Sequence, residues 1–221
     1  IYLTLALPLI LLINFNYIIH PLSYLLKNTE YSRMAEYEAI LLAKHRARFS
    51  IRLIPGKITN AYVTGILPFS RVILVGEELL KIMTQRQIEG ILMHEVGHFK
   101  HGHMRKLFYI SLLVSPLAIS LFNIRSEMAI LNNFLILDLA SVGLAGGVLG
   151  FLMLYIPGRF QRKYELQADL FAAKAVGAET YLSALDIMDE VSGGEVSKGG
   201  NTHPNLVSRV KHIKSMMHEE Q

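Results

Sequence analysis

Three long apolar runs separate the polar parts of this chain. Residues 1–26 contain no Asp, Glu, Lys or Arg, and the runs 107–124 and 134–157 carry a single charge between them, at Asp138. A helix that spans a bilayer needs about 20 apolar residues. The pattern therefore predicts about three transmembrane helices: one at 1–26 and a hairpin within 107–157. A cleaved signal peptide is the alternative for the first run, but that run lacks a basic start and a small-residue cleavage site.

The basic residues predict the orientation of these helices. Of the 22 Lys and Arg, 21 lie in the polar parts that flank the hairpin, and only Arg125 lies in the connection 125–133. The positive-inside rule places the flanking parts in the cytoplasm. Contact with anionic lipid also explains the net charge of +4, so nothing in the sequence points to nucleic acid. We expect a multi-pass integral membrane protein, in the inner membrane if the source is bacterial.

The polar residues 27–106 combine helical and strand patterns. Apolar positions at helical spacing predict an amphipathic helix over 31–46. Short β-leaning stretches broken by Pro and Gly predict a small sheet; they lie at 49–54, 60–67 and 71–75. Two helices are expected next, at 77–83 and at 85–103, the second with Thr84 as its N-cap.

The polar residues 158–221 are predicted to be helical. Helices are expected over 159–191 and 205–218, around a glycine-containing mobile loop at 192–201 that is a candidate cover for the active-site cleft. The fold class is therefore α+β and mainly α, with a small sheet and about three membrane helices. The two polar parts, 27–106 and 158–221, would together form one cytoplasmic catalytic unit.

Composition restricts the chemistry that the chain can carry. The 221 residues are 52% apolar and include no cysteine. This excludes a disordered protein, a disulfide-stapled secreted domain and any site built on thiolates. Histidine and carboxylate side chains remain as candidate ligands and catalysts.

The segment His94-Glu95-Val96-Gly97-His98 is the clearest candidate. On a helix, positions i and i+4 share a face, so the two imidazoles can bind one zinc ion. The Glu beside the first His is then placed to act as general base on the attacking water. The preceding residues, 87–93, form a helical run that leads directly into the motif.

Two histidines leave a catalytic zinc short of one protein ligand. Glu165 is the leading candidate, because it follows the third apolar run and two crossings return the chain to the side of His94. Asp169 lies one turn further on the same face and can accept an N–H from a ligating imidazole. Alternatively, both are solvated helix carboxylates. His101, seven residues after His94, is an alternative ligand.

These residues resemble the HtpX-type membrane zinc metalloproteases, which are related to the prenyl-protein (CAAX) endopeptidases. Two further segments share the resemblance: Asn60-Ala61-Tyr62, before the zinc helix, and His203-Pro204 with Arg209, near the C-terminus. The four motifs occur in the family's order and span about two thirds of the chain. The HtpX pattern has two N-terminal membrane helices where this chain shows one.

The resemblance implies a role for each matching residue. It implies that one zinc ion is bound by His94, His98 and Glu165, that Glu95 is the general base, and that Asp169 supports a ligand. It also implies that an extended substrate lies on the strand at Asn60, Ala61 and Tyr62. His203 and Arg209 would lie near the site, where a donor can stabilise the oxyanion.

The sequence thus predicts a membrane-embedded zinc endopeptidase, with misfolded or damaged membrane proteins as the substrates that the resemblance implies. A prenyl-protein endopeptidase is one alternative, although three membrane helices are few for a large intramembrane chamber. A non-catalytic metal-binding or metal-transport membrane protein is the other, although it has no use for Glu95. The natural substrate and the oligomeric state are not determined by the sequence.

Overall fold

A mixed four-stranded sheet forms the base of the folded part in the computed structural model, which describes residues 20–27, 30–110, 112, 143–144, 147–148, 151 and 155–219. The strands are β1 (Ser32–Arg33), β2 (Ser50–Ile54), β3 (Ala61–Thr64) and β4 (Val72–Gly76). Their order is β1-β2-β4-β3, with β2 and β4 parallel and the other two pairs antiparallel. All five residues of β4 are buried, as expected for a central strand covered on both faces. β3 is left at one edge of the sheet.

The two faces of the sheet are covered by different helices. Ile54, Val72 and Leu74 pack under α2 (His20–Leu26) through its buried Tyr24. The opposite face carries Ile51, Val63 and Ile73, and it packs against the helices α3 (Ala35–His45), α4 (Glu77–Ile82) and α5 (Gln85–Lys100). This second face holds the main hydrophobic core and the predicted zinc helix.

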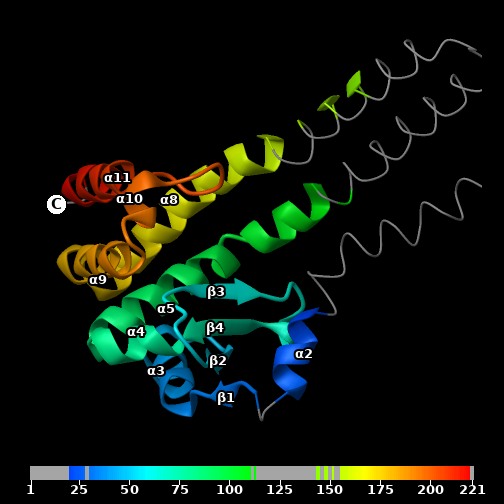
Figure 1. Cartoon of the computed structure of the whole chain (residues 1–221). Helices are drawn as coiled ribbons and strands as arrows, with labels where there is room; N and C mark the ends of the chain where they lie inside the picture. The colour runs from blue at the N-terminus through cyan, green and yellow to red at the C-terminus, as the bar shows by residue number, and fades with distance from the viewer. Residues whose placement is uncertain are drawn as a thin grey trace, which may run out of the picture.

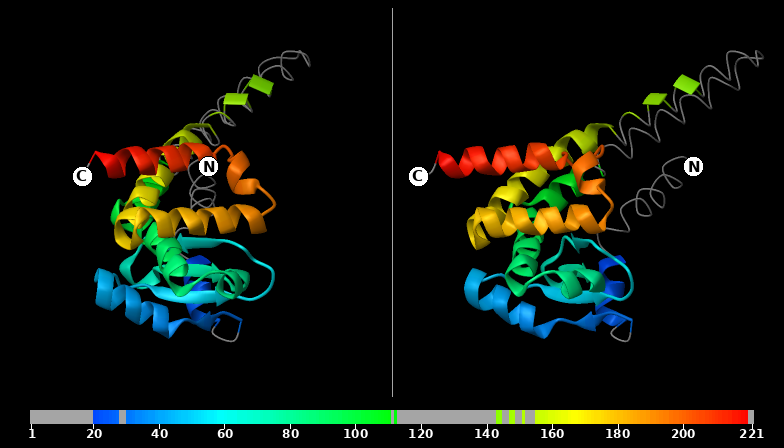
Figure 2. Two further views of the ribbon diagram at one scale, coloured as in Figure 1. Left: turned by 90° about the vertical axis from the view of Figure 1, so that its left-hand side faces the viewer. Right: turned by 60° about the vertical axis from the view of Figure 1, so that its left-hand side comes forward.

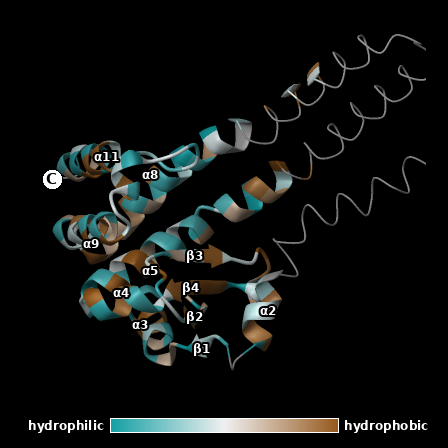
Figure 3. Cartoon of the chain, viewed as in Figure 1, coloured by the Kyte–Doolittle hydropathy of each residue, from teal (hydrophilic) through white to brown (hydrophobic). Residues whose placement is uncertain are grey.

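The remaining helices lie on the side of α5 away from the sheet (Figures 1 and 2). They are α8 (Ile156–Val176), α9 (Ala178–Val191), the short α10 (Glu195–Lys198) and α11 (Leu206–His218). α8 and α9 both contact α5, and α11 packs on α8 and α9. In Figure 3, β3 and β4 are mainly hydrophobic, whereas α8 is largely hydrophilic. α5 is therefore shared between the sheet and the helical layer.

Local sequence explains how α5 begins and how closely it packs. Thr84 and Gln87 form a reciprocal capping box at its N-terminus, which confirms the predicted cap. At Gly97, inside the histidine motif, a Cβ would lie 3.2 Å from Ala168 Cα and 3.2 Å from Phe171 Cβ on α8. The missing side chain therefore lets α8 approach α5 closely at the candidate metal site.

The structure moves several predicted boundaries. Residues 32–33 pair with β2 instead of opening the predicted helix at 31–46, and the predicted strand at 60–67 is shortened to β3. The helix predicted over 85–103 ends at Lys100, because Gly102 adopts a positive φ of 68°. A similar break at Gly177, with φ 94°, separates α8 from α9 within the segment 159–191, where helices were predicted.

The predicted membrane spans fall largely outside the described residues. The last part of the first span, 20–26, forms α2 on the sheet, and the described parts of 107–124 and 134–157 are short and helical. In the described part of the chain, no helix combines the length and the apolar character that crossing a membrane requires.

Candidate metal centre

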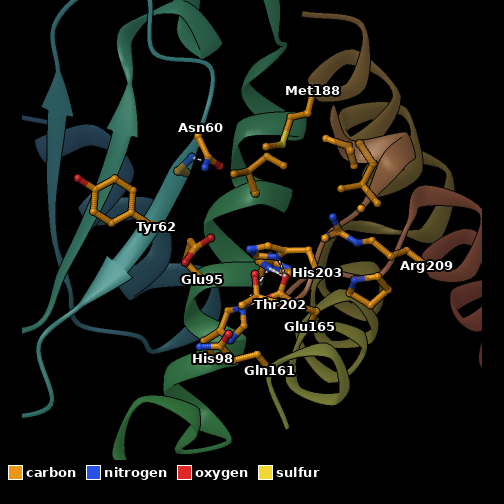
Figure 4. A pocket seen from close by; sticks show the side chains of 18 of the residues that line it. Asn60, Tyr62, Glu95, His98, Gln161, Glu165, Met188, Thr202, His203 and Arg209 are labelled. Atoms are coloured by element: carbon orange, nitrogen blue, oxygen red, sulfur yellow. Dashed lines mark hydrogen bonds and ion pairs between the residues drawn. The ribbon is translucent and has the colours of Figure 1, made fainter. Parts of the chain in front are cut away.

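α5 and α8 bring three potential ligands to one point. His94 Nε2 lies 3.1 Å from His98 Nε2. The Glu165 carboxylate reaches both, with Oε2 at 3.4 Å from His94 Nε2 and Oε1 at 3.3 Å from His98 Nε2. Among the described residues, these are the side chains grouped so that one ligand atom from each lies within 4.8 Å of the others. All three line one pocket, in which Figure 4 shows His98 and Glu165 close together.

This donor set fits a zinc ion. Two imidazole nitrogens and one carboxylate are a common set of protein ligands in catalytic zinc sites, where a fourth position stays open. The cluster also favours a positive charge. Burial lowers the pKa of His94, but hydrogen bonds and charges of Asp169 and Glu165 outweigh it and raise the pKa to about 10.

Glu165 is held as a charged carboxylate. Burial raises its pKa, but hydrogen bonds from His203, His94 and His98 outweigh burial and hold the pKa well below the usual range. His203 Nδ1 lies 3.1 Å from Glu165 Oε2, while its own side chain is 61% exposed. The structure therefore places His203 at the rim of the site, in contact with a candidate ligand.

Behind His94 lies a buried hydrogen-bonded group. Asp169 Oδ1 is 3.0 Å from His94 Nδ1, and the Tyr181 hydroxyl is 2.9 Å from the same nitrogen. The Tyr181 hydroxyl also donates to Asp169 Oδ1 at 2.7 Å. Asp169 thus occupies the position that the sequence predicted for it. Tyr181 had no recognisable signal in the sequence, because nothing marks one tyrosine of α9 as a ligand partner.

Arg209 completes this group from α11. Its Nε donates to Asp169 Oδ2 at 2.8 Å and its Nη2 donates to Oδ1 at 2.5 Å. Burial raises the pKa of Asp169, but the Arg209 charge and hydrogen bonds outweigh burial and lower the pKa. The guanidinium is therefore bound to Asp169 behind His94. Its predicted contact with an oxyanion stays a prediction.

A different pair of side chains lies behind His98. His103 is fully buried, and its Nδ1 lies 3.1 Å from His98 Nδ1. Its Nε2 lies 3.0 Å from Gln167 Oε1 on α8. Burial lowers the pKa of His103 to about 4, so the ring is neutral. His101 is exposed and contacts Phe171 instead, so it does not join the cluster as the alternative ligand.

Glu95 faces the edge strand β3. Its Oε2 accepts a hydrogen bond from Val63 N–H at 2.8 Å, and burial raises its pKa. Gly76 N–H donates to Asn60 O at 2.9 Å. In the antiparallel register, residues 60, 62 and 64 therefore bond to β4, and Ala61 and Val63 direct their backbone groups to the open edge.

The predicted substrate-binding residues occupy different positions on this strand. Asn60 Oδ1 accepts the Ala61 N–H at 2.9 Å. Tyr62 points away from the cluster (Figure 4), and its pKa is raised by burial and by a hydrogen bond with Tyr24. Val63 presents an N–H at the open edge, although the motif Asn60-Ala61-Tyr62 does not include it. The sequence could have indicated Val63, because alternate residues of a strand direct their backbone groups to the same edge and Val63 is two residues after Ala61.

β3 and the helical layer enclose a cleft of about 840 Å³ over the cluster. The cleft runs along the open edge of β3 and is also lined by the segment 192–201, which was predicted to be a loop but contains the short helix α10. Beyond the histidines, Ile91, Leu185 and Met188 contribute an apolar wall. An extended chain in this cleft would pass directly over Glu95 and Glu165.

Comparison with known proteins matches this chain to a peptidase family and to individual proteases. The model of peptidase family M48 matches residues 26–217. The chain is 31% identical over 179 residues to a protease HtpX homolog of Neisseria meningitidis serogroup C / serotype 2a, covering 71% of this chain and 62% of that protein. It is 32% identical over 139 residues to protease HtpX of Shewanella frigidimarina, covering 58% and 48%. The chain thus spans about three fifths of the first relative's length.

A solved structure shares the fold. The crystal structure of S. mikatae Ste24p superimposes with a TM-score of 0.68 over 96% of this chain and 58% of that chain. The two sequences are 18% identical, so this likeness is one of fold.

Proposed function

Because this chain belongs to peptidase family M48, we propose that it is a zinc-dependent endopeptidase. The observation that carries this proposal is the convergence of His94, His98 and Glu165 beside a buried Glu95, at the floor of a cleft with an open strand edge. A metal-storage or transport site would need the ligands but not the general base or the strand. Zinc is the proposed ion, because two imidazoles and one carboxylate are a common ligand set of catalytic zinc sites.

The side chains of the site divide the work of hydrolysis. When bound, zinc would supply Lewis-acid chemistry that polarises the scissile carbonyl and lowers the pKa of water. Glu95 takes the proton of the attacking water and delivers it to the leaving amine. Burial, which raises the Glu95 pKa, suits this group to both steps. His203, which contacts Glu165 at the rim, would donate to the oxyanion that forms.

β3 would hold the substrate as an additional antiparallel strand. Ala61 and Val63 present backbone groups along the open edge, and main-chain hydrogen bonds there tolerate varied side chains. Val63 N–H is taken by Glu95 in the present arrangement. A substrate carbonyl that accepts this N–H would release the Glu95 carboxylate toward the water.

We extend the proposal to location and substrate class. The apolar runs at 1–26, 107–124 and 134–157 would anchor the chain in a membrane, and the charge distribution favours a cytoplasmic site. A site at the membrane surface with an unspecific strand edge suits misfolded or damaged membrane proteins. Lipid and polypeptide substrates are then the partners expected.

The test is proteolysis by the detergent-purified, zinc-loaded chain on fluorescein-labelled casein and on an unfolded membrane protein. Glu95→Gln is expected to lower the cleavage rate by about 10²–10⁴-fold, with bound zinc still near one per chain. Glu179→Gln, at an exposed position of α9, is the matched control and should cleave normally. Zinc binding without cleavage in parent and control would contradict the peptidase proposal and favour a non-catalytic metal site.

A further inference from the structure

The position of His103 depends on the break after α5. On an uninterrupted helix, residues five apart project about 140° from each other, so His103 would turn away from His98. Gly102 interrupts the helix with φ 68°, and the chain is helical again over 103–110. This break returns the His103 ring to the cluster, with Nδ1 at 3.1 Å from His98 Nδ1.

The hydrogen-bond partners determine which nitrogens carry protons. The Gln167 amide oxygen only accepts, so His103 Nε2 is the N–H that faces it at 3.0 Å. The other nitrogen, His103 Nδ1, faces His98 Nδ1 at 3.1 Å, and a hydrogen bond between them needs one unprotonated nitrogen. That nitrogen is His103 Nδ1, because a ligating His98 keeps its Nε2 lone pair for the metal and carries its proton on Nδ1. His98 Nε2 is left with a free lone pair, and this is the nitrogen that faces His94 and Glu165.

Packing fixes the His103 ring in this position. The ring stacks on Tyr164, with ring centroids 4.3 Å apart and an angle of 11° between the ring planes. Tyr164 directly precedes Glu165 on α8, and Gln167 follows two residues later. The same turn of α8 therefore carries Glu165, a candidate ligand, and also Tyr164 and Gln167, which both contact His103.

We propose that His103 is a positioning residue for the metal centre: as a neutral acceptor it holds His98 in the tautomer and orientation that direct Nε2 to the ion. Gln167 orients His103 in turn by accepting its Nε2–H. We call His103 and Gln167 the neutral relay. The inference rests on the proposed zinc site. It adds a residue whose side chain does not touch the metal or the substrate.

The experiment measures zinc affinity of the detergent-purified full chain by competition with a chromogenic chelator. His103→Phe keeps a ring to stack on Tyr164 but removes the acceptor, and the expected loss is about 10–100-fold, as for other partners of ligating imidazoles. His103→Asn places an amide oxygen near the former Nδ1 and should regain most of that affinity. His101→Phe, the same change at an exposed histidine, should bind zinc like the parent.

The outcomes separate this inference from the proposed function. A parent chain that binds no zinc would overturn the proposed metal site and this inference together. A zinc-binding parent with an unchanged affinity in His103→Phe would overturn the inference alone. Equal losses in His103→Phe and His103→Asn would show that ring packing, not the acceptor, matters. If His103→Phe fails to fold, as judged by melting of the metal-free protein, Gln167→Leu tests the relay from its far end, and an unchanged affinity there would contradict it.

Discussion

The two imidazoles of the candidate metal centre are supported in opposite ways. His94 is backed by a charged group, in which Asp169 is paired with Arg209 and bonded to Tyr181. His98 is backed by neutral His103. Either partner can fix the tautomer of a ligating histidine, but only the carboxylate adds negative charge to the site. Both imidazoles therefore have a hydrogen-bond partner at Nδ1, but only the partner of His94 belongs to a buried charge pair.

Charge balance gives a reason for this asymmetry. The two positive charges of zinc and the one of Arg209 equal the formal charges of three carboxylates, which are Glu95, Glu165 and Asp169. A further carboxylate behind His98 would leave a net negative charge in a buried site, where uncompensated charge is strongly destabilising. A neutral relay avoids this.

Gly97→Leu is expected to have the largest effect, because it disrupts both supports at once. The new side chain would meet Ala168 and Phe171 on α8, where a Cβ alone would lie at 3.2 Å. Displacing α8 removes Glu165 from the cluster, so zinc affinity should fall by more than the 10–100-fold typical of one supporting partner. Gly97→Ala needs a shift of a few tenths of an ångström and should bind zinc far better. Competition with a chelator measures both.

Asp169→Asn tests the charged support alone. It weakens the hold on His94 Nδ1 and leaves Arg209 buried without a charged partner. We expect zinc affinity to fall by about 10–100-fold and the free energy of unfolding of the metal-free chain to fall by about 3–5 kcal/mol. Chemical denaturation measures the second quantity. An Asn variant as stable as the parent would show that the ion pair does not support the fold.

Glu89→Gln separates a buried charge from a ligand partner. Glu89 is buried on α5 among Lys44, His45 and Arg86, and none of these residues belongs to the cluster. We expect unfolding to become easier by about 1–3 kcal/mol, with zinc affinity unchanged. A large loss of zinc affinity would mean that any destabilisation of α5 weakens zinc binding. The loss in Asp169→Asn would then not be evidence for a specific support of His94 by Asp169.

The contribution of Glu89 to the free energy of unfolding depends on pH in a defined direction. Burial raises the Glu89 pKa, but hydrogen bonds from His45 and Lys44 and the charges of Lys44 and Arg86 outweigh burial and lower it. The stabilisation is therefore complete above the unfolded value of about 4.3 and is lost as pH falls through the lower folded value. Thermal melting of parent and Glu89→Gln should differ at pH 7 and converge in acid. A difference that grows in acid would contradict this assignment.

Gln167→Leu should give the smallest effect on the metal. It removes the acceptor of His103 Nε2–H but leaves His103 stacked on Tyr164 and next to His98. We expect a loss of zinc affinity smaller than that of His103→Phe, measured with the same chelator. A loss as large as that of Asp169→Asn would mean that the neutral and charged supports do not differ as proposed.

The elements and ligands that depend on local sequence could be predicted. The cap at Thr84 and the i, i+4 spacing of His94 and His98 are set within one helix, so the sequence locates them directly. The prediction of Glu165 as a ligand needed a further assumption, namely that the two apolar runs cross the membrane and return the chain to the side of His94. The structure brings all three side chains together.

The supporting residues depend on contacts between distant segments and on backbone breaks. The supporting position of His103 has no signal in the sequence, because a continuous helix to 103 would turn its side chain away from His98, and the positive φ of Gly102 reverses that. Tyr181 and the partner of Arg209 depend on how α9 and α11 pack on α8. The predicted membrane spans lie mostly outside the described residues and stay predictions.

The most direct test of the proposed metal centre is X-ray absorption at the zinc edge of the metal-loaded, detergent-purified chain. We expect one zinc per chain, with two imidazole nitrogens at about 2.0–2.1 Å and oxygen ligands at about 2.0–2.2 Å. Glu165→Gln should change the oxygen shell and keep both imidazoles. A spectrum with three or more imidazoles would place another histidine on the metal and contradict both the ligand set and the supporting role of His103.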